Sequence, residues 1–187
     1  MRKAQIERNT KETQIKIDLC LDGGDVEVST GIGFFDHMLV AFGVHGGFGL
    51  KIKVNGDLQV DTHHTVEDTG IALGRAFKEA LGDMSGIERY GSAYIPMDEA
   101  LGFASLDISN RPFLVSKADF HDDRAGNFDT CLTEEFFSFS HRSSRLYAHH
   151  KHGVIITVVI LYGICHLLRI AGGNRAIGET VYHAAGS

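Results

Sequence analysis

The spacing of apolar residues between positions 14 and 81 constrains the fold of this chain more than any other feature. Polar and apolar residues alternate over 14–21, and the alternation resumes over 26–28 after Asp22-Gly23-Gly24-Asp25. A period of two predicts a β-hairpin with one buried face. The elements that follow are predicted, in order, as a helix over 34–46, a strand over 50–54 and a helix over 65–81.

The same order of elements restarts near Tyr90. Strands are expected over 93–108, broken at Pro96, and over 113–120, and a further helix is expected to begin at Glu134. We therefore predict an α+β fold in which sheets pack against helices. The whole chain, 1–187, would be a single domain of two similar α/β halves, about 1–88 and 89–187, each with the order strand-strand-helix-strand-helix.

Composition excludes several classes of partner and cofactor. The net charge of −6 gives no electrostatic basis for nucleic acid or an anionic membrane as the main partner. Three widely spaced cysteines indicate neither a disulfide framework nor a thiolate zinc site. The most apolar stretch, 154–162, is too short to span a bilayer, and the N-terminus lacks the apolar core of a signal peptide. We expect a cytoplasmic protein.

Eleven histidines direct attention to metal binding, above all the pair His63-His64. On a helix, Glu67 shares a face with His63 at i, i+4 and with His64 at i, i+3. Adjacent histidines point about 100° apart, so they can serve two different ions. Nitrogen and oxygen donors without thiolates suit manganese, iron, nickel or zinc. The alternative interpretation is a solvated helix start. For His37, on an apolar helix, the alternative is a partly buried histidine.

Several ordered segments of the chain resemble imidazoleglycerol-phosphate dehydratases over about residues 5–137. The similar segments are RNTKET (8–13), TGIGFFDHML (30–39), DTHHTVED (61–68), RYGS (89–92), IPMDEA (95–100), DISNRP (107–112), FDT (128–130) and EEFF (134–137). The resemblance implies a hydro-lyase of histidine biosynthesis that dehydrates imidazole-glycerol phosphate to imidazole-acetol phosphate. It also implies two manganese ions per complete site and a large homo-oligomer with sites between subunits.

The resemblance assigns roles to individual residues. Arg89 and Arg111 would grip the substrate phosphate, where otherwise we would expect a surface salt bridge and a turn arginine. Glu12 and Glu67 are the predicted catalytic residues, and Glu12 would also contact the substrate. The predicted metal ligands are His37, His63, His64, Glu67 and, by its distance from the EEFF segment, His149.

The last quarter of the chain departs from the family pattern. No histidine pair followed by glutamate at the family spacing occurs after residue 150. Residues from about 138 onward are either a shifted-frame translation or a decayed region, or else a divergent segment in which His149, His150, His152 and His166 rebuild the site. The alternative function is a family member that binds metal without catalysis. A histidine-rich storage protein is disfavoured, because the resemblance extends well beyond the histidines.

Overall fold

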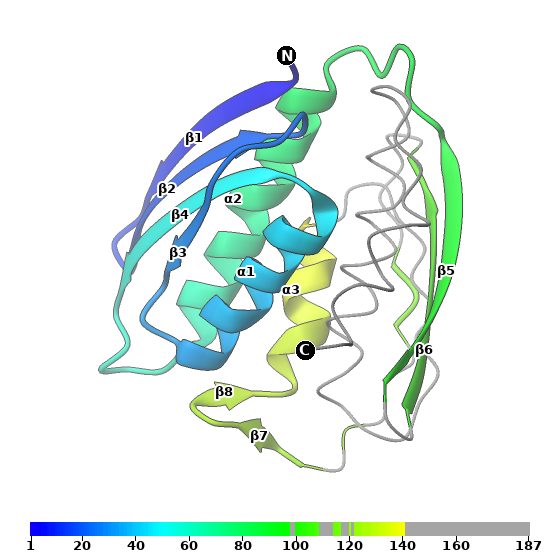
Figure 1. Cartoon of the computed structure of the whole chain (residues 1–187). Helices are drawn as coiled ribbons and strands as arrows, with labels where there is room; N and C mark the ends of the chain where they lie inside the picture. The colour runs from blue at the N-terminus through cyan, green and yellow to red at the C-terminus, as the bar shows by residue number, and fades with distance from the viewer. Residues whose placement is uncertain (98–99, 109–113, 117–119, 121, 141–187) are drawn as a thin grey trace, which may run out of the picture.

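A four-stranded sheet covers one side of the molecule (Figure 1). The computed structural model describes residues 1–140, apart from 98–99, 109–113, 117–119 and 121. The spatial order of the strands is β1-β2-β4-β3, and β1, β2 and β4 run antiparallel while β3 runs parallel to β4. The strands are β1 (Lys3–Asn9), β2 (Thr13–Cys20), β3 (Val26–Ser29) and β4 (Gly49–Gly56).

The predicted alternation in β2 is confirmed, because Ile15, Ile17 and Leu19 are buried against the helices. The predicted hairpin between 14–21 and 26–28 is wrong. β2 pairs with β1 and β4, and β3 lies on the far side of β4. The connection between β2 and β3 crosses the start of β4, where a Cβ on Gly49 would lie 2.8 Å from the carbonyl oxygen of Gly23. Glycines permit this close crossing. In the sequence, a polar segment with two glycines looks the same whether it forms a hairpin turn or a crossing connection.

Behind the sheet, the described residues form a layer of three helices (Figure 1). They are α1 (Gly33–Gly46), α2 (His63–Leu81) and α3 (Leu132–Ser140), and all three were predicted. α2 begins two residues earlier than expected, so both paired histidines belong to its first turn. α2 and α3 pack closely, because a Cβ on Gly70 would lie 2.8 Å from the carbonyl oxygen of Phe136.

A second sheet lies on the opposite side of the helices from the first (Figure 1). It is an antiparallel hairpin of β5 (Tyr90–Met97) and β6 (Ala100–Asp107). The predicted single strand over 93–108 is therefore wrong: the chain turns back at 98–99, and Pro96 lies inside β5. The predicted strand over 113–120 is not present at residues 114–116 or 120, and its other residues lie outside the described part. A short hairpin of β7 (Arg124–Ala125) and β8 (Phe128–Asp129) leads into α3.

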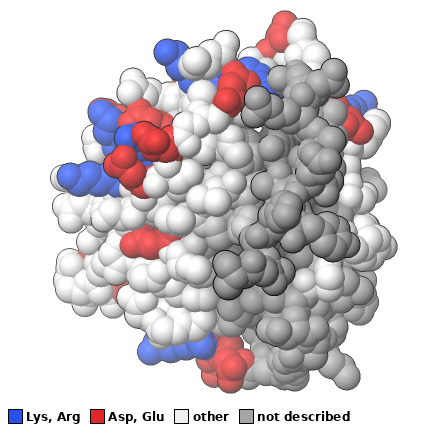
Figure 2. Space-filling model, viewed as in Figure 1, with Lys and Arg blue, Asp and Glu red and all other residues white. Residues whose placement is uncertain are grey.

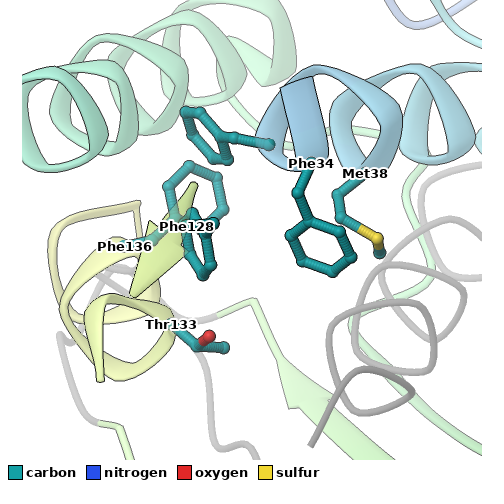
Figure 3. A pocket seen from close by; sticks show the side chains of 6 residues that line it. Phe34, Met38, Phe128, Thr133 and Phe136 are labelled. Carbon is teal, nitrogen blue, oxygen red and sulfur yellow. The ribbon is translucent and has the colours of Figure 1, made fainter. Parts of the chain in front are cut away.

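One core joins both sheets to the helices and confirms the α+β fold. It contains Ile17 of β2, Leu50 of β4 and Leu106 of β6. Figure 3 shows side chains of α1, β8 and α3 around a cavity of about 10 Å³. A cavity of this size, lined almost entirely by apolar atoms, is a packing gap and not a ligand site.

The surface drawn in Figure 2 carries acidic and basic side chains close together. Among the exposed ion pairs are Lys16 with Glu7 and Lys51 with Glu27. Such pairs contribute little to stability. No helix within the described residues is long and apolar enough to cross a membrane.

Candidate functional site

Three of the predicted site residues, His63, His64 and Glu67, lie together at the start of α2. The carboxylate of Asp61 accepts a hydrogen bond from the backbone N–H of His63 at 2.8 Å. This bond satisfies one of the free N–H groups at the helix start. Because the helix begins at His63, the side chains of His63, His64 and Glu67 all project from its N-terminal end.

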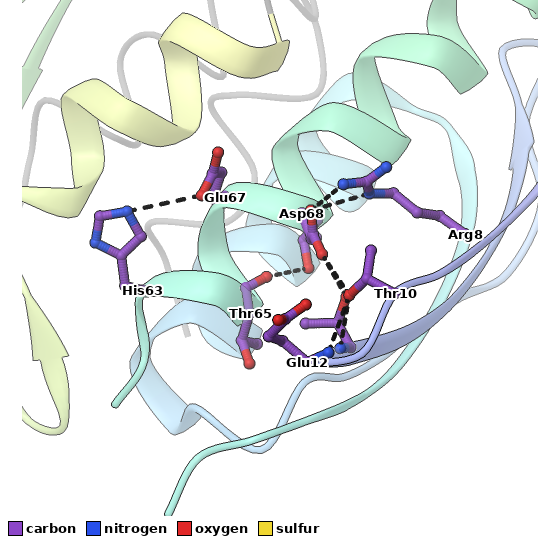
Figure 4. A network of polar contacts seen from close by, with 9 residues as sticks. Arg8, Thr10, Glu12, His63, Thr65, Glu67 and Asp68 are labelled. Carbon is purple, nitrogen blue, oxygen red and sulfur yellow. Dashed lines mark hydrogen bonds and ion pairs between the residues drawn. The ribbon is translucent and has the colours of Figure 1, made fainter. Parts of the chain in front are cut away.

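His63 contacts two carboxylates. Its Nε2 lies 3.7 Å from Oε2 of Glu67, one helical turn on, and 2.7 Å from Oε2 of Glu135 on α3. The prediction that His63 and Glu67 share a helix face is confirmed (Figure 4). The contact with Glu135 was not predicted, because it depends on the packing of α2 against α3. Its sequence signal was only that Glu135 lies in one of the segments that resemble the family.

His64 contacts a different carboxylate from His63. The two imidazole rings are 6.3 Å apart between centroids and inclined at 68°. Nδ1 of His64 lies 3.0 Å from Oδ2 of Asp57, and this hydrogen bond, followed by the nearby negative charges of Asp57, Asp61 and Glu12, raises the pKa of His64. A carboxylate only accepts hydrogen bonds, so Nδ1 carries the proton and Nε2 is left for a ligand. Asp57 was not predicted, because nothing in its loop marks it as a partner of the helix.

Glu12 lies at the tip of the β1–β2 hairpin, beside the start of α2 (Figure 4). Its side chain is exposed, and its charge acts on His64. Asp68, next to Glu67, is buried and accepts hydrogen bonds from Arg8, Thr10 and Thr13 (Figure 4). Burial raises the pKa of Asp68, but the hydrogen bonds from Thr13 and Arg8 and the charge of Arg8 outweigh burial and hold that pKa below its usual value. Asp68 is therefore a carboxylate at neutral pH.

Arg89 does not lie at this site within one chain. It precedes β5, beyond the C-terminal end of α2, and the 19 residues of that helix span about 28 Å. Its Nε donates to Oδ1 of Asp107 at 2.7 Å, and its guanidinium lies 4.8 Å from the centre of the Tyr90 ring. The surface salt bridge expected in the absence of the resemblance is thus present.

The remaining predicted residues are not brought to the start of α2 by the described structure. His37 is exposed on α1, so the alternative of a partly buried histidine is wrong. Arg111 and His149 lie outside the described residues, as does the sequence from 141 onward.

The donor set at the start of α2 fits manganese in chemistry, because it offers imidazole nitrogens and carboxylate oxygens without thiolates. Within the described part of the chain, no group of three or more histidine, cysteine, aspartate or glutamate side chains is arranged to hold an ion. There, Oδ1 of Asp57 and the hydroxyls of Thr62 and Thr65 are buried without a hydrogen-bond partner. Because the described residues do not form a complete set of ligands, a metal at this cluster would need further ligands from outside it.

Comparison with known proteins shows that this chain is similar to members of one family. The family model for imidazoleglycerol-phosphate dehydratase matches residues 30–154. The imidazoleglycerol-phosphate dehydratase of Streptococcus thermophilus is 62% identical over 138 residues, which are 73% of this chain and 71% of that protein. The protein of the same name from Ruminiclostridium cellulolyticum is 51% identical over 183 residues, which are 97% of this chain and 90% of that protein.

A solved structure agrees with the sequence comparisons. The crystal structure of imidazoleglycerol-phosphate dehydratase from Staphylococcus aureus superposes with a TM-score of 0.77 at 34% identity. The superposition covers 89% of this chain and 96% of that one. The fold and the sequence therefore point to the same relatives.

Proposed function

The chain belongs to the imidazoleglycerol-phosphate dehydratase family, and on this basis we propose that it is a manganese-dependent hydro-lyase of histidine biosynthesis. Its reaction is the dehydration of imidazole-glycerol phosphate to imidazole-acetol phosphate. The observation that carries the proposal is the first turn of α2, where Glu67 and Glu135 meet the Nε2 atom of His63. His64 and Glu12 flank this cluster.

His63, His64 and Glu67 would hold the metal, with donors added from outside the cluster. Manganese bound there would act as a Lewis acid toward a ring nitrogen of the substrate and stabilise the electron-rich ring. The hydrogen bond from His64 to Asp57 fixes that imidazole with Nε2 available for coordination. His37, which is exposed on α1, and His149 are the proposed additional ligands.

The protein side chains of the site would handle the protons. Dehydration breaks the C–O bond on the carbon attached to the imidazole ring and a C–H bond on the neighbouring carbon, and the resulting enol becomes the ketone. The proton on that neighbouring carbon would pass to a carboxylate of the cluster, and Glu12 would donate a proton to the departing hydroxyl, which leaves as water. Its exposed position at the hairpin tip gives Glu12 access to a substrate.

The phosphate would be bound by Arg89 and Arg111, whose guanidinium groups match phosphate oxygens. Arg89 is half-exposed and bound to Asp107, so a phosphate can replace that carboxylate. Its position beyond the opposite end of α2 supports a site completed by a second copy of the chain. A homo-oligomer with sites between subunits is therefore part of the proposal.

Turnover tests the proposed function directly. The purified full chain with added manganese should convert imidazole-glycerol phosphate to imidazole-acetol phosphate, and Glu67→Ala should abolish this. Glu79→Ala is a matched control, because Glu79 is exposed on the same helix far from the site. The proposal fails if the wild-type chain gives no product.

The second candidate is a family member that binds manganese without catalysis. This candidate is favoured because the sequence after residue 150 contains no second histidine pair followed by a glutamate. Calorimetric titration with manganese separates the two: fewer than two ions per chain, with no turnover, supports the binding protein. Two ions per chain with turnover supports the enzyme.

A further inference from the structure

One hydroxyl group organises the tip of the β1–β2 hairpin, which carries Glu12. The Oγ1 atom of Thr10 accepts hydrogen bonds from the backbone N–H groups of Glu12, at 3.2 Å, and Thr13, at 3.0 Å. The backbone N–H of Thr10 donates to the carbonyl of Thr13 at 2.8 Å and closes the turn. The backbone of Glu12 is therefore held by the side chain of Thr10.

This turn is fixed to α2 through a buried carboxylate. Oδ2 of Asp68 accepts hydrogen bonds from the hydroxyls of Thr13, at 2.5 Å, and Thr10, at 3.3 Å (Figure 4). Its other oxygen accepts from the Nε of Arg8 at 2.9 Å. A buried carboxylate that has all these donors resists displacement, because any movement leaves a charge unsatisfied.

The attachment point places the hairpin tip beside the proposed site. Asp68 directly follows Glu67 in α2. The Glu67 carboxylate faces His63, and the Asp68 carboxylate binds the β1–β2 hairpin. Glu12, in the turn held by the Thr10 hydroxyl, lies beside the start of α2 (Figure 4).

Pairing of β1 with β2 does not by itself require such a network. At the other end of the same two strands, Arg2 donates to a carboxylate oxygen of Asp22 at 2.9 Å in a partly exposed pair. Within the described residues, no threonine hydroxyl joins that pair. The additional buried bonds occur at the end that carries Glu12.

We infer that Thr10 and Asp68 are positioning residues that hold the Glu12 carboxylate beside the start of α2 for proton transfer to the substrate. This inference rests on the proposed function. Proton transfer requires the acid within hydrogen-bond reach of the reacting atom, and a misplacement of about 1 Å lowers the rate by about 100-fold. An unanchored hairpin tip would populate many positions of Glu12 and few productive ones.

The test is a double-mutant cycle between Thr10→Val and Glu12→Gln in the full chain with manganese. Thr10→Val is expected to lower kcat by about 10-fold to 100-fold, with the manganese affinity and KM within about twofold of the wild type. Thr10→Ser, which keeps the hydroxyl, should restore most of kcat. In the Glu12→Gln background, Thr10→Val should have no further effect, because the residue acts through Glu12.

The control is Asp22→Asn, which weakens the pair at the other end of the strands and should leave kcat unchanged. The inference is overturned if Thr10→Val is fully active while Glu12→Gln is impaired, or if their effects multiply. If Thr10→Val does not fold, Asp68→Asn takes its place in the same cycle with the same expectations. A wild-type chain without turnover overturns the proposed function and the inference together, and so is a distinct result.

Discussion

Two arginine–aspartate pairs, one beside the start of α2 and one at the β5–β6 hairpin, differ in their surroundings. The Arg8 and Asp68 side chains are 24% and 10% exposed, and two threonine hydroxyls also donate to Asp68. The Arg89 and Asp107 side chains are 46% and 29% exposed, at the open end of the β5–β6 hairpin. The residue types are the same, but only the first pair is largely removed from water.

Burial determines what each pair can do. Separating Arg8 from Asp68 leaves a charge in a poorly solvated position, so that pair serves as a fixed attachment. Separating Arg89 from Asp107 exposes both groups to water, and the arginine can then bind another anion. The Arg8–Asp68 pair therefore fixes the region around the start of α2, whereas Arg89 can exchange its partner Asp107 for another anion.

The largest expected effect comes from breaking the buried pair. Asp68→Ala should lower the free energy of unfolding by about 3 kcal/mol, because Arg8 then lacks its carboxylate and two threonines lose their acceptor. Asp107→Ala, the matched change in the other pair, should cost less than about 1 kcal/mol. Urea unfolding followed by circular dichroism measures both, and equal losses would remove the distinction between the pairs.

A smaller effect is expected at Asp57, which also belongs to the region around α2. Asp57→Asn should weaken manganese binding by about 10-fold to 100-fold, because the amide no longer holds His64 as a charged acceptor does. Isothermal titration calorimetry with manganese measures the change. Asp22→Asn provides a control far from the site, and an unchanged affinity in Asp57→Asn would show that this hydrogen bond does not orient a ligand.

Elements that each bury one regular face could be predicted from the sequence, because their apolar residues recur at a fixed spacing. The buried face of β2, the strand β4 and all three helices follow from spacing, because each element buries one regular stripe or face. β1 was not predicted, because its apolar residues are only Ala4 and Ile6, too few to mark a strand by spacing. The β2–β3 hairpin was predicted wrongly, because strand order depends on long-range pairing across Gly49 and not on the turn.

For the site too, contacts within one helix could be predicted from the sequence, and contacts between separate segments could not. The contact of His63 with Glu67 is a property of one helix and follows from the sequence. The contacts of His63 with Glu135 and of His64 with Asp57 join separate segments, so no local spacing reveals them. Asp68 and Thr10 lie within segments that resemble the family, but only the structure shows that they bind each other.

A smaller effect is expected at the exposed pair between Arg89 and Asp107, where a phosphate would have to displace the carboxylate. If Asp107 competes with the substrate phosphate for Arg89, Asp107→Asn should lower KM by about twofold to fivefold, the effect of one exposed ion pair. Asp129→Asn is the matched control, because Asp129 pairs with exposed Arg124 on the short β7–β8 hairpin. An increase in KM for Asp107→Asn would instead show that Asp107 orients Arg89 for phosphate binding.

The smallest expected effect lies at the pair between Arg2 and Asp22, which is partly exposed. The pKa of Asp22 lies below its usual value, mainly because the backbone N–H of Arg2 donates to the carboxylate at 2.6 Å. A lowered pKa in the folded state stabilises the fold above the unfolded value, near 3.8, and this contribution is lost as the pH falls through the folded value. Asp22→Asn should therefore cost about 0.5 kcal/mol at pH 7 and at pH 5, with a smaller loss below about pH 4. Urea midpoints at these pH values measure the difference, and a cost that does not change with pH would mean that the charge of Asp22 contributes nothing.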